Sequence, residues 1–367
     1  MSGSIFGKNF CISTWGESHG KALGVVVDGC PAGIPLSEED IQKDLDRRKP
    51  GRSPFSSPRK ESDRVEILSG VFDGRTTGTP VSLILYNTNQ RPYDYSDISK
   101  IYRPGHADYT YDQKYGFRDY RGGGRSSGRE TAARVAAGAI AKKILKELGV
   151  TVTAYTLSIG DVEIDKEKFD REEIYNNFLA MPDKDAAKRA EELLYKRKEE
   201  NDSTGGVIEC MVEGLPGGVG EPVFEKLDAM LARAVFSIGA VKGFEIGSGF
   251  KAAKMKGSEH NDEYHYDENG RLIKLTNNAG GIVGGISDGY PIIFRAAFKP
   301  TPSIYAKQKS VNKEGENVEI QIEGRHDPII VPRAVIVVEA MTAITLVDYL
   351  FQRILSRMDL IKKVFNN

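Results

Sequence analysis

The order of apolar and polar positions repeats in the two halves of the chain. In each half a β-branched, strand-like run ends in a proline–glycine turn, VDGCPAGI at Val27–Ile34 and VEGLPGGV at Val212–Val219. A helical pattern follows each turn, EEDIQKDLDRR in the first half and FEKLDAMLARAV in the second. Short apolar runs bounded by Gly and Pro are typical of strands, and a 3.6-residue period is typical of helices.

The repeat continues beyond these turns. Gly70–Asn87 and Gly284–Phe298 each carry an Asp-Gly turn before an apolar run, as expected of a turn and a strand. The segments ETAARVAAGAIAKKIL and AMTAITLVDYLFQRIL then predict amphipathic-to-buried helices. The pattern therefore predicts a single domain over 1–367 with two pseudo-repeats, about 1–150 and 204–355, and a site between them. Chance matches of Gly and Pro turns are the alternative explanation.

Two further segments carry no predicted catalytic chemistry. The stretch 164–202 is rich in charges of both signs and predicts a helical insert with a solvated face or an oligomer contact. The polar segment EHNDEYHYDEN predicts an exposed or ligand-gated loop. We favour this loop over a metal site built on its His260 and His265, and we predict no metal site in the chain.

Charge and cysteine usage narrow the class of protein. The chain has 51 Lys+Arg, 52 Asp+Glu and a net charge of −1, which argues against a nucleic-acid binder and leaves room for local basic patches. No apolar run approaches the roughly 20 residues of a membrane span, and residues 1–20 lack the pattern of a secretory signal. The spacing of Cys11, Cys30 and Cys210 fits neither CxxC nor zinc, so we expect reduced thiols in a cytoplasmic protein.

A glycine-rich turn before a predicted helix is a candidate anion site. Gly122–Gly124 precede Ser127-Gly-Arg-Glu130, a capping-box pattern at the start of a helix expected from about Thr131 to Leu148. Backbone N–H groups and the helix dipole at such a position favour an anion. Two acids and five arginines give residues 118–134 a charge of +3; the arginines are Arg118, Arg121, Arg125, Arg129 and Arg134. We favour an anion site over a plain helix cap.

A second basic segment, Arg47–Arg64, has seven basic and two acidic residues, and its prolines exclude a regular helix through its middle. It predicts either a flexible loop beside a polyanion site or a solubilising loop. Three of the five histidines, His19, His106 and His326, lie in Gly or Pro turns beside arginines or acids. Imidazole titrates near pH ~6.5, so histidines suit proton transfer. Together these features favour an active site that handles phosphate.

Common catalytic motifs are missing from the sequence. It contains no P-loop, no HExxH and no GxSxG elbow. The glycine-rich segment Gly280–Gly289 lacks the strand-to-helix context of a dinucleotide fold and leads into a strand-like run, which suits a close backbone approach to a flat ligand.

The sequence resembles the chorismate synthase family in several long motifs. Three long segments resemble its signature regions: GESHGKALGVVVDGCPAGIPL, YRPGHADYTYDQKYGFRDYRGGGRSSGRETAARVAAGAIA and GRHDPIIVPRAVIVVEAMTAITLVD. Two shorter segments, GGIVGGISDG and KPTPSI, also match. The resemblance covers essentially the whole chain. It implies a carbon–oxygen lyase of the shikimate pathway, which converts 5-enolpyruvylshikimate 3-phosphate to chorismate by 1,4-anti elimination of phosphate. It also implies a requirement for reduced FMN without net redox change, and NADPH as an indirect reductant.

The resemblance also implies roles for individual residues. His19 matches the histidine that protonates the departing phosphate, His106 the one against the reduced flavin, and Asp327 the acid that works with flavin N5 to remove the C6 proton. Arg48 resembles a substrate-side arginine that also contacts NADP, and Arg129 a second anion clamp. Many members carry an arginine where this chain has Pro54, so Arg52 is the candidate replacement. The implied FMN contacts are Arg125, Ser126, Ser127, Gly239, Ala240, Gly284, Lys299, Pro300, Thr301, Pro302, Ser303 and Arg325.

From the repeat and the resemblance together we expect an α+β fold, a duplicated pseudo-twofold βαβ-type sandwich with helices packed between antiparallel sheets. The family implies a homotetramer that binds no nucleic acid or membrane. No reductase segment is evident, which favours an external flavin reductase. Two other functions stay open: a phosphate- or RNA-binding module built on the basic loops, and a flavin oxidoreductase.

Overall fold

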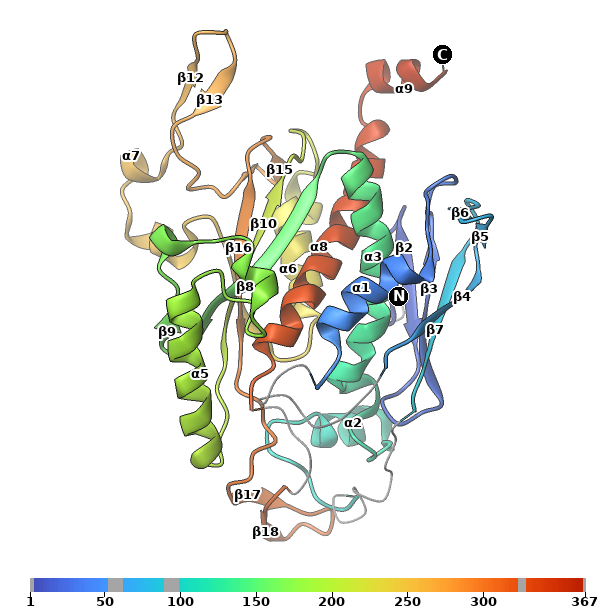
Figure 1. The fold of residues 1–367 in the computed structure, drawn as a ribbon, viewed down its shortest axis with the longest axis vertical. Coiled ribbons are helices and arrows are strands. Elements are labelled where there is room, and N and C mark those ends of the chain that lie inside the picture. The colour runs from blue at the N-terminus through green and yellow to red at the C-terminus, as the bar shows by residue number, and fades with distance from the viewer. Residues whose placement is uncertain (1–2, 52–61, 89–98, 323–327, 366–367) are drawn as a thin grey trace.

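Two five-stranded antiparallel sheets enclose four helices (Figure 1). The computed structural model describes residues 3–51, 62–88, 99–322 and 328–365. The first sheet has the order β1 (Ile5–Phe6), β2 (Cys11–Trp15), β3 (Ala22–Asp28), β7 (Val81–Tyr86) and β4 (Val65–Ser69). The second has the order β9 (Val162–Glu163), β8 (Thr151–Ile159), β10 (Gly206–Glu213), β16 (Ile292–Phe298) and β11 (Val241–Ile246).

The two sheets repeat one strand pattern. The central strands β3 and β10 both end in the proline–glycine turns found in the sequence, and each pairs with the strand after an Asp-Gly turn, β7 or β16. Small hairpins occupy the corresponding place in each half: β5 (Val71–Phe72) with β6 (Arg75–Thr76), and β14 (Ile282–Val283) with β15 (Ile286–Ser287). The α+β fold class with helices between antiparallel sheets is therefore confirmed.

The helices between the sheets are α1 (Glu38–Arg48), α3 (Thr131–Glu147), α6 (Leu227–Phe236) and α8 (Val331–Ile354). Helix α1 starts where the sequence predicts because Ser37 and Asp40 form a reciprocal capping box. Helices α3 and α8 pack directly together at the centre. A Cβ on Gly138 of α3 would lie 2.3 Å from Cβ of Ala340, so this close crossing requires glycine.

Helix α8 is the core helix of the fold. By length and composition it could cross a membrane, but 94% of its apolar window is buried inside the protein. It packs against β8 and β10 of the second sheet and against helices α1, α3 and α6, which explains why it is apolar on all sides. The sequence-based prediction that no apolar run comes close to the length of a membrane span was wrong for α8. The helix has the length and composition of a span but forms part of the core.

The remaining elements surround the sandwich. The charged insert holds α4 (Glu173–Asn176) and α5 (Lys184–Glu199), whose apolar face covers β9. Helix α2 (Asp108–Tyr115) and the hairpin β17 (Gln308–Val311)–β18 (Asn317–Ile320) lie at the lower end in Figure 1. Helix α9 (Met358–Phe365) lies at the upper end.

The predicted loop Glu259–Asn269 needs correction. Its residues contribute to α7 (Gly257–His260) and to the hairpin β12 (Tyr264–Tyr266)–β13 (Leu272–Lys274). Alternating aromatic and polar residues and the turn at Asp267–Gly270 favour this hairpin over an open loop.

Candidate active site

A cavity of about 420 Å³ opens where the two central helices begin. This volume lies in the range of small-molecule sites, about 300–1,000 Å³. Six separate segments of the chain line it, among them the first turns of α3 and α8. The lining residues singled out by the sequence are Arg48, His106, Ser126, Ser127, Arg129, Gly239, Ala240, Lys299, Thr301, Pro302 and Ser303.

The glycine turn is one wall of this cavity. Gly122, Gly123 and Gly124 have φ values of 75°, 116° and 54°, which favour glycine. A Cβ on Gly122 would also lie 2.4 Å from Nε2 of His19. The turn therefore packs directly on the buried His19 ring, while Gly122 and Gly123 themselves face the cavity. Glycine at 122 is required both by its φ and by this contact.

The helix after this turn begins at Thr131, as predicted, but its cap differs from the prediction. Ser127 Oγ accepts from the Arg129 amide at 3.3 Å and caps the short 3₁₀ turn Gly128–Glu130, after which α3 starts at Thr131. The Glu130 carboxylate accepts from Arg134 instead of returning to Ser127, with Nε–Oε2 at 3.0 Å. The reciprocal capping box is therefore wrong, because the 3₁₀ turn separates its two partners. Ser127 is at once a cap and a cavity residue.

Four of the five arginines around this turn neutralise local acids or bind the backbone. Arg121 pairs with Asp119, and Arg134 with Glu130. Arg125 points to β2, where Nη2 lies 2.7 Å from Thr14 Oγ1. Only Arg129 lines the cavity among these five. The expectation that all five gather around one anion is wrong.

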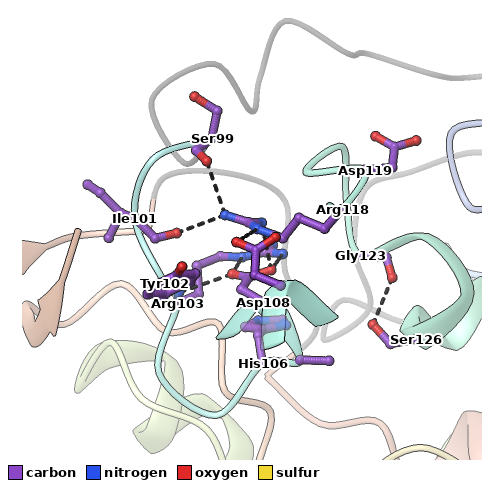
Figure 2. Close-up of polar contacts among 12 residues, drawn as sticks. Ser99, Ile101, Tyr102, Arg103, His106, Asp108, Arg118, Asp119, Gly123 and Ser126 are labelled. Carbon is purple, nitrogen blue, oxygen red and sulfur yellow. Dashed lines mark hydrogen bonds and ion pairs between the residues drawn. The ribbon is translucent and has the colours of Figure 1, made fainter. Parts of the chain in front are cut away.

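Asp108 organises the loop before α2. Figure 2 shows the side chains of Arg103 and Arg118 converging on its carboxylate from either side. Arg103 binds both oxygens at 2.8 Å, and Arg118 binds Oδ1 at 3.0 Å. All three side chains are buried, and the arginines hold the pKa of Asp108 below its usual range despite burial. This network fixes the turn that carries His106.

His106 lies at the cavity between two loops. Its Nε2 is 2.7 Å from Ser303 Oγ. Lys299 links the same loops, since its ammonium donates to the Gly105 carbonyl at 3.3 Å and its amide donates to the Ala240 carbonyl at 2.9 Å. Ala240 has a φ of 73°, and such strain in a non-glycine residue gathers at functional sites. Burial, with Lys242 nearby, lowers the pKa of Lys299.

Two buried arginines that line the cavity share one carboxylate. Arg48, Asp63 and Arg129, hereafter the pocket cluster, are all at most 6% exposed. Asp63 Oδ1 accepts from Arg129 Nη1, and its Oδ2 lies 3.6 Å from Arg48 Nε. Burial lowers the pKa of Arg48 to about 10, although Asp63 opposes this, so the guanidinium stays charged at neutral pH. Arg48 ends α1 and does not belong to the loop that follows it.

The electrostatic character of the cavity is basic. Five cationic residues line it, and no carboxylate does so within the described parts of the chain; the cations are Arg48, Arg103, Arg129, Lys299 and Arg333. The N-termini of α3 and α8 also open there, which adds positive potential. The cavity can therefore bind a multiply charged anion and stabilise negative charge that develops on it.

Other residues predicted for the site lie elsewhere. His19 is behind Gly122, and Pro300 belongs to the loop of Lys299 without lining the cavity. Gly284 lies in the β14–β15 hairpin, against Lys226 through Gly285, and does not line the cavity. Arg52, Arg325, His326 and Asp327 fall outside the described residues.

Sequence reasoning missed three charged residues of this region. Arg333 lies in the first turn of α8, where a lone cation before an apolar helix is a usable signal. Arg103 stands three residues before His106 and could have been found by that proximity. Asp63 gives no local signal, because its partners Arg48 and Arg129 lie 15 and 66 residues away in the sequence.

Comparison with known proteins places the chain in one family. The family model described as chorismate synthase matches residues 10–351. A chorismate synthase of Lachnospira eligens is 64% identical over 365 residues, and one of Lachnoclostridium phytofermentans is 63% identical over 365 residues, with 100% of both chains covered in each case. A solved structure titled "Crystal Structure of Chorismate Synthase" matches with a TM-score of 0.76 and 33% identity, covering 98% of this chain and 97% of that one. The chain therefore belongs to the chorismate synthase family, lyases of the shikimate pathway that form chorismate by eliminating phosphate from 5-enolpyruvylshikimate 3-phosphate.

Proposed function

We propose that the elimination takes place in the 420 Å³ cavity, with 5-enolpyruvylshikimate 3-phosphate held against its arginines. One observation carries this proposal: five cations and two helix N-termini surround a cavity whose described lining has no carboxylate. The substrate carries two carboxylates and a phosphate, so its binding needs several cations. Arginine suits this task because its planar group binds carboxylate and phosphate in a bidentate manner.

We propose that reduced FMN binds in the same cavity. The glycines at 122 and 123 bring bare backbone to the wall, as a flat ligand requires, and Lys299 and Arg129 offer cations to a phosphate. Ser126, Ser127, Gly239, Ala240 and the Lys299–Ser303 loop would hold the group, together with Arg125 behind the turn. Bound reduced FMN supplies electron density to the substrate as phosphate leaves.

The residues of the chain divide the remaining work. Arg48 and Arg129 bind substrate anions and stabilise the charge that grows on the departing phosphate. His19 keeps from the resemblance its proposed role as proton donor to that phosphate, from a position directly behind the cavity wall at Gly122. His106, oriented by Ser303, interacts with the cofactor. Asp327, Arg325 and Arg52 keep their proposed roles from the resemblance: proton removal from C6, cofactor contact and anion contact.

Reductant and cell compartment form a further part of the proposal. On this proposal FMN is reduced outside this chain, by NADPH through a separate flavin reductase. The enzyme is cytoplasmic, in keeping with free thiols at Cys11, Cys30 and Cys210.

The enzyme assembles as a homotetramer. Large side chains such as Phe72, Phe224 and Phe250 are 79%, 92% and 81% exposed in the single chain, and subunit contacts would bury surface of this kind. Light scattering after size-exclusion chromatography should give four times 40.4 kDa; a monomer at micromolar concentration would contradict this assembly.

The function is tested by an anaerobic assay. Purified protein, 5-enolpyruvylshikimate 3-phosphate and chemically reduced FMN should yield chorismate and inorganic phosphate in equal amounts. Oxidised FMN under the same conditions should yield neither. Rapid oxidation of NADPH without the substrate would instead support a flavin oxidoreductase, and absence of chorismate with reduced FMN would refute the proposal.

A further inference from the structure

The pocket cluster has an uneven balance of charge. Two arginines that line the cavity face a single carboxylate, and Arg333 adds a third cation close enough to lower the pKa of Arg48. Asp63 itself does not line the cavity. Its side chain is buried behind both guanidinium groups, with one oxygen turned to each. The buried carboxylate thus contacts both guanidinium groups from the side away from the cavity.

The hydrogen bonds of the pocket cluster are incomplete. Arg48 Nε, Asp63 Oδ2 and Arg129 Nη2 are buried and have no hydrogen-bond partner among the described residues. Buried polar atoms are almost always satisfied in native proteins, so unsatisfied ones need an explanation. Arg129 is otherwise fully engaged, through Nε to Asn87 Oδ1 at 3.0 Å and through Nη1 to Asp63. Its remaining nitrogen, Nη2, is buried and lacks a hydrogen-bond partner among the described residues.

The backbone at Asp63 is also unusual. Its φ of 47° lies in the left-handed region, where Asn and Asp are tolerated better than other side chains. The residue lies near the end of the basic segment, two positions before β4 begins at Val65, and its carboxylate is carried into the interior there. This conformation is what brings Asp63 between the ends of α1 and α3.

We propose that Asp63 is a positioning residue, which holds the guanidinium groups of Arg48 and Arg129 assembled on the cavity wall before the anionic substrate arrives. This inference rests on the proposed use of these arginines as substrate ligands. Without Asp63, three neighbouring cations would repel one another, and each would lose its fixed direction. Preorganised donors cost no reorganisation at the moment of reaction, whereas a misplacement of about 1 Å can lower the rate on the order of 10²-fold.

The test uses two variants, Asp63→Asn and Asp63→Gly. Asparagine and glycine both accept a positive φ, so the charge is removed without backbone strain, and the glycine variant serves if the asparagine variant does not fold. The control is Asp348→Asn. Asp348 is also buried and accepts from the amides of Lys8, Asn9 and Phe10, and it does not line the cavity.

Two readouts separate positioning from a structural role. In the anaerobic assay, the Asp63 variants should lose kcat on the order of 10²-fold, with KM for the substrate unchanged or lower, because every cation remains. Inorganic phosphate should raise the Tm of these variants at least as much as that of the wild type. Asp348→Asn should lower Tm and leave kcat and the phosphate shift unchanged.

The outcomes are distinct. A folded Asp63 variant with kcat within about twofold of the wild type overturns the inference, as does loss of the phosphate-induced shift in Tm. Arg129→Ala is measured in parallel. If it also retains full activity, the proposed function of the pocket cluster fails; if it is impaired while the Asp63 variants are not, only the positioning role fails.

Discussion

Two neighbouring residues of α1, Arg47 and Arg48, enter two buried clusters of opposite character. Arg47 belongs to the core cluster with Lys142 and Glu339, and Arg48 to the pocket cluster. Glu339 accepts from Arg47 at 2.8 Å and 3.0 Å, from Lys142 at 2.9 Å, and from the Ala154 amide at 3.2 Å. The core carboxylate is fully satisfied, whereas three polar atoms of the pocket cluster have no hydrogen-bond partner in the part of the chain that the structure describes.

This difference in hydrogen bonding indicates that the core cluster serves stability and the pocket cluster serves function. A buried charge with complete hydrogen bonds joins α1, α3 and α8 to β8, and it leaves nothing for a ligand. A buried pair of cations with too few acceptors is costly until an anion completes it. Adjacent positions on one helix thus serve two purposes, because their side chains leave α1 in different directions.

The largest expected effect comes from breaking the core cluster. Glu339→Ala should lower the free energy of unfolding by about 3–5 kcal/mol, because Arg47 and Lys142 lose their buried partner. Urea denaturation followed by circular dichroism measures this loss. Glu213→Ala, which removes an exposed ion pair with Arg171, should change stability by less than about 1 kcal/mol. A Glu339 variant as stable as this control would remove the structural side of the comparison.

The next effect comes from the pocket cluster. Arg129→Ala should lower kcat/KM by about 10²–10³, as expected for loss of one charge-stabilising donor, with a small change in Tm because Asp63 keeps Arg48. Steady-state kinetics under anaerobic conditions report it. Arg171→Ala is the matched control, an arginine in an exposed pair, and should keep wild-type kinetics. Similar kinetics in the two variants would refute the role of Arg129.

Acid should weaken the core cluster in a defined window. Lys142 and Arg47 lower the pKa of Glu339 to about 2 in spite of burial, from a usual 4.5. A depressed pKa gives stability that is complete above about pH 4.5 and is lost as pH falls toward 2. Across this window the wild type should lose up to about 1.4 kcal/mol per pH unit more than Glu339→Gln. Parallel pH dependences of stability would contradict the assignment.

A smaller effect is expected at the other wall of the cavity. Ser303→Ala removes the hydroxyl 2.7 Å from His106 Nε2. Loss of one such hydrogen bond is worth about 1 kcal/mol, so kcat should fall about fivefold, whereas His106→Ala should cost about 10²–10⁴. Both variants are predicted to bind oxidised FMN, measured by fluorescence quenching. Equal losses in the two would show that Ser303 does more than orient the ring.

Much of the fold was readable from the sequence because its signals are local. The proline–glycine turns, the Asp-Gly turns and the apolar runs set strands and helices within a few residues, and their repetition together with the family resemblance predicted helices between two sheets. Helix α3 starts at Thr131 as predicted, but the predicted capping box was wrong, because a 3₁₀ turn at Gly128–Glu130 precedes the helix and Glu130 pairs with Arg134.

The site was predicted less completely because charge pairing is a tertiary property. The sequence identified His106 and Arg129 through motifs, but it could not show that Arg118 and Arg121 are neutralised by Asp108 and Asp119. Nor could it place Asp63 between two arginines from different helices. Counting cations in a segment overestimates those that face a ligand.

The most direct test compares Arg47→Ala with Arg48→Ala in binding of inorganic phosphate, measured by titration calorimetry, and in Tm. Arg48→Ala should weaken phosphate about 10-fold, as expected for a charged hydrogen bond, while Arg47→Ala should keep the phosphate affinity and lose more Tm. Equal phosphate affinity in wild type and Arg48→Ala, or equal weakening by both substitutions, would contradict the division of α1 between core and site.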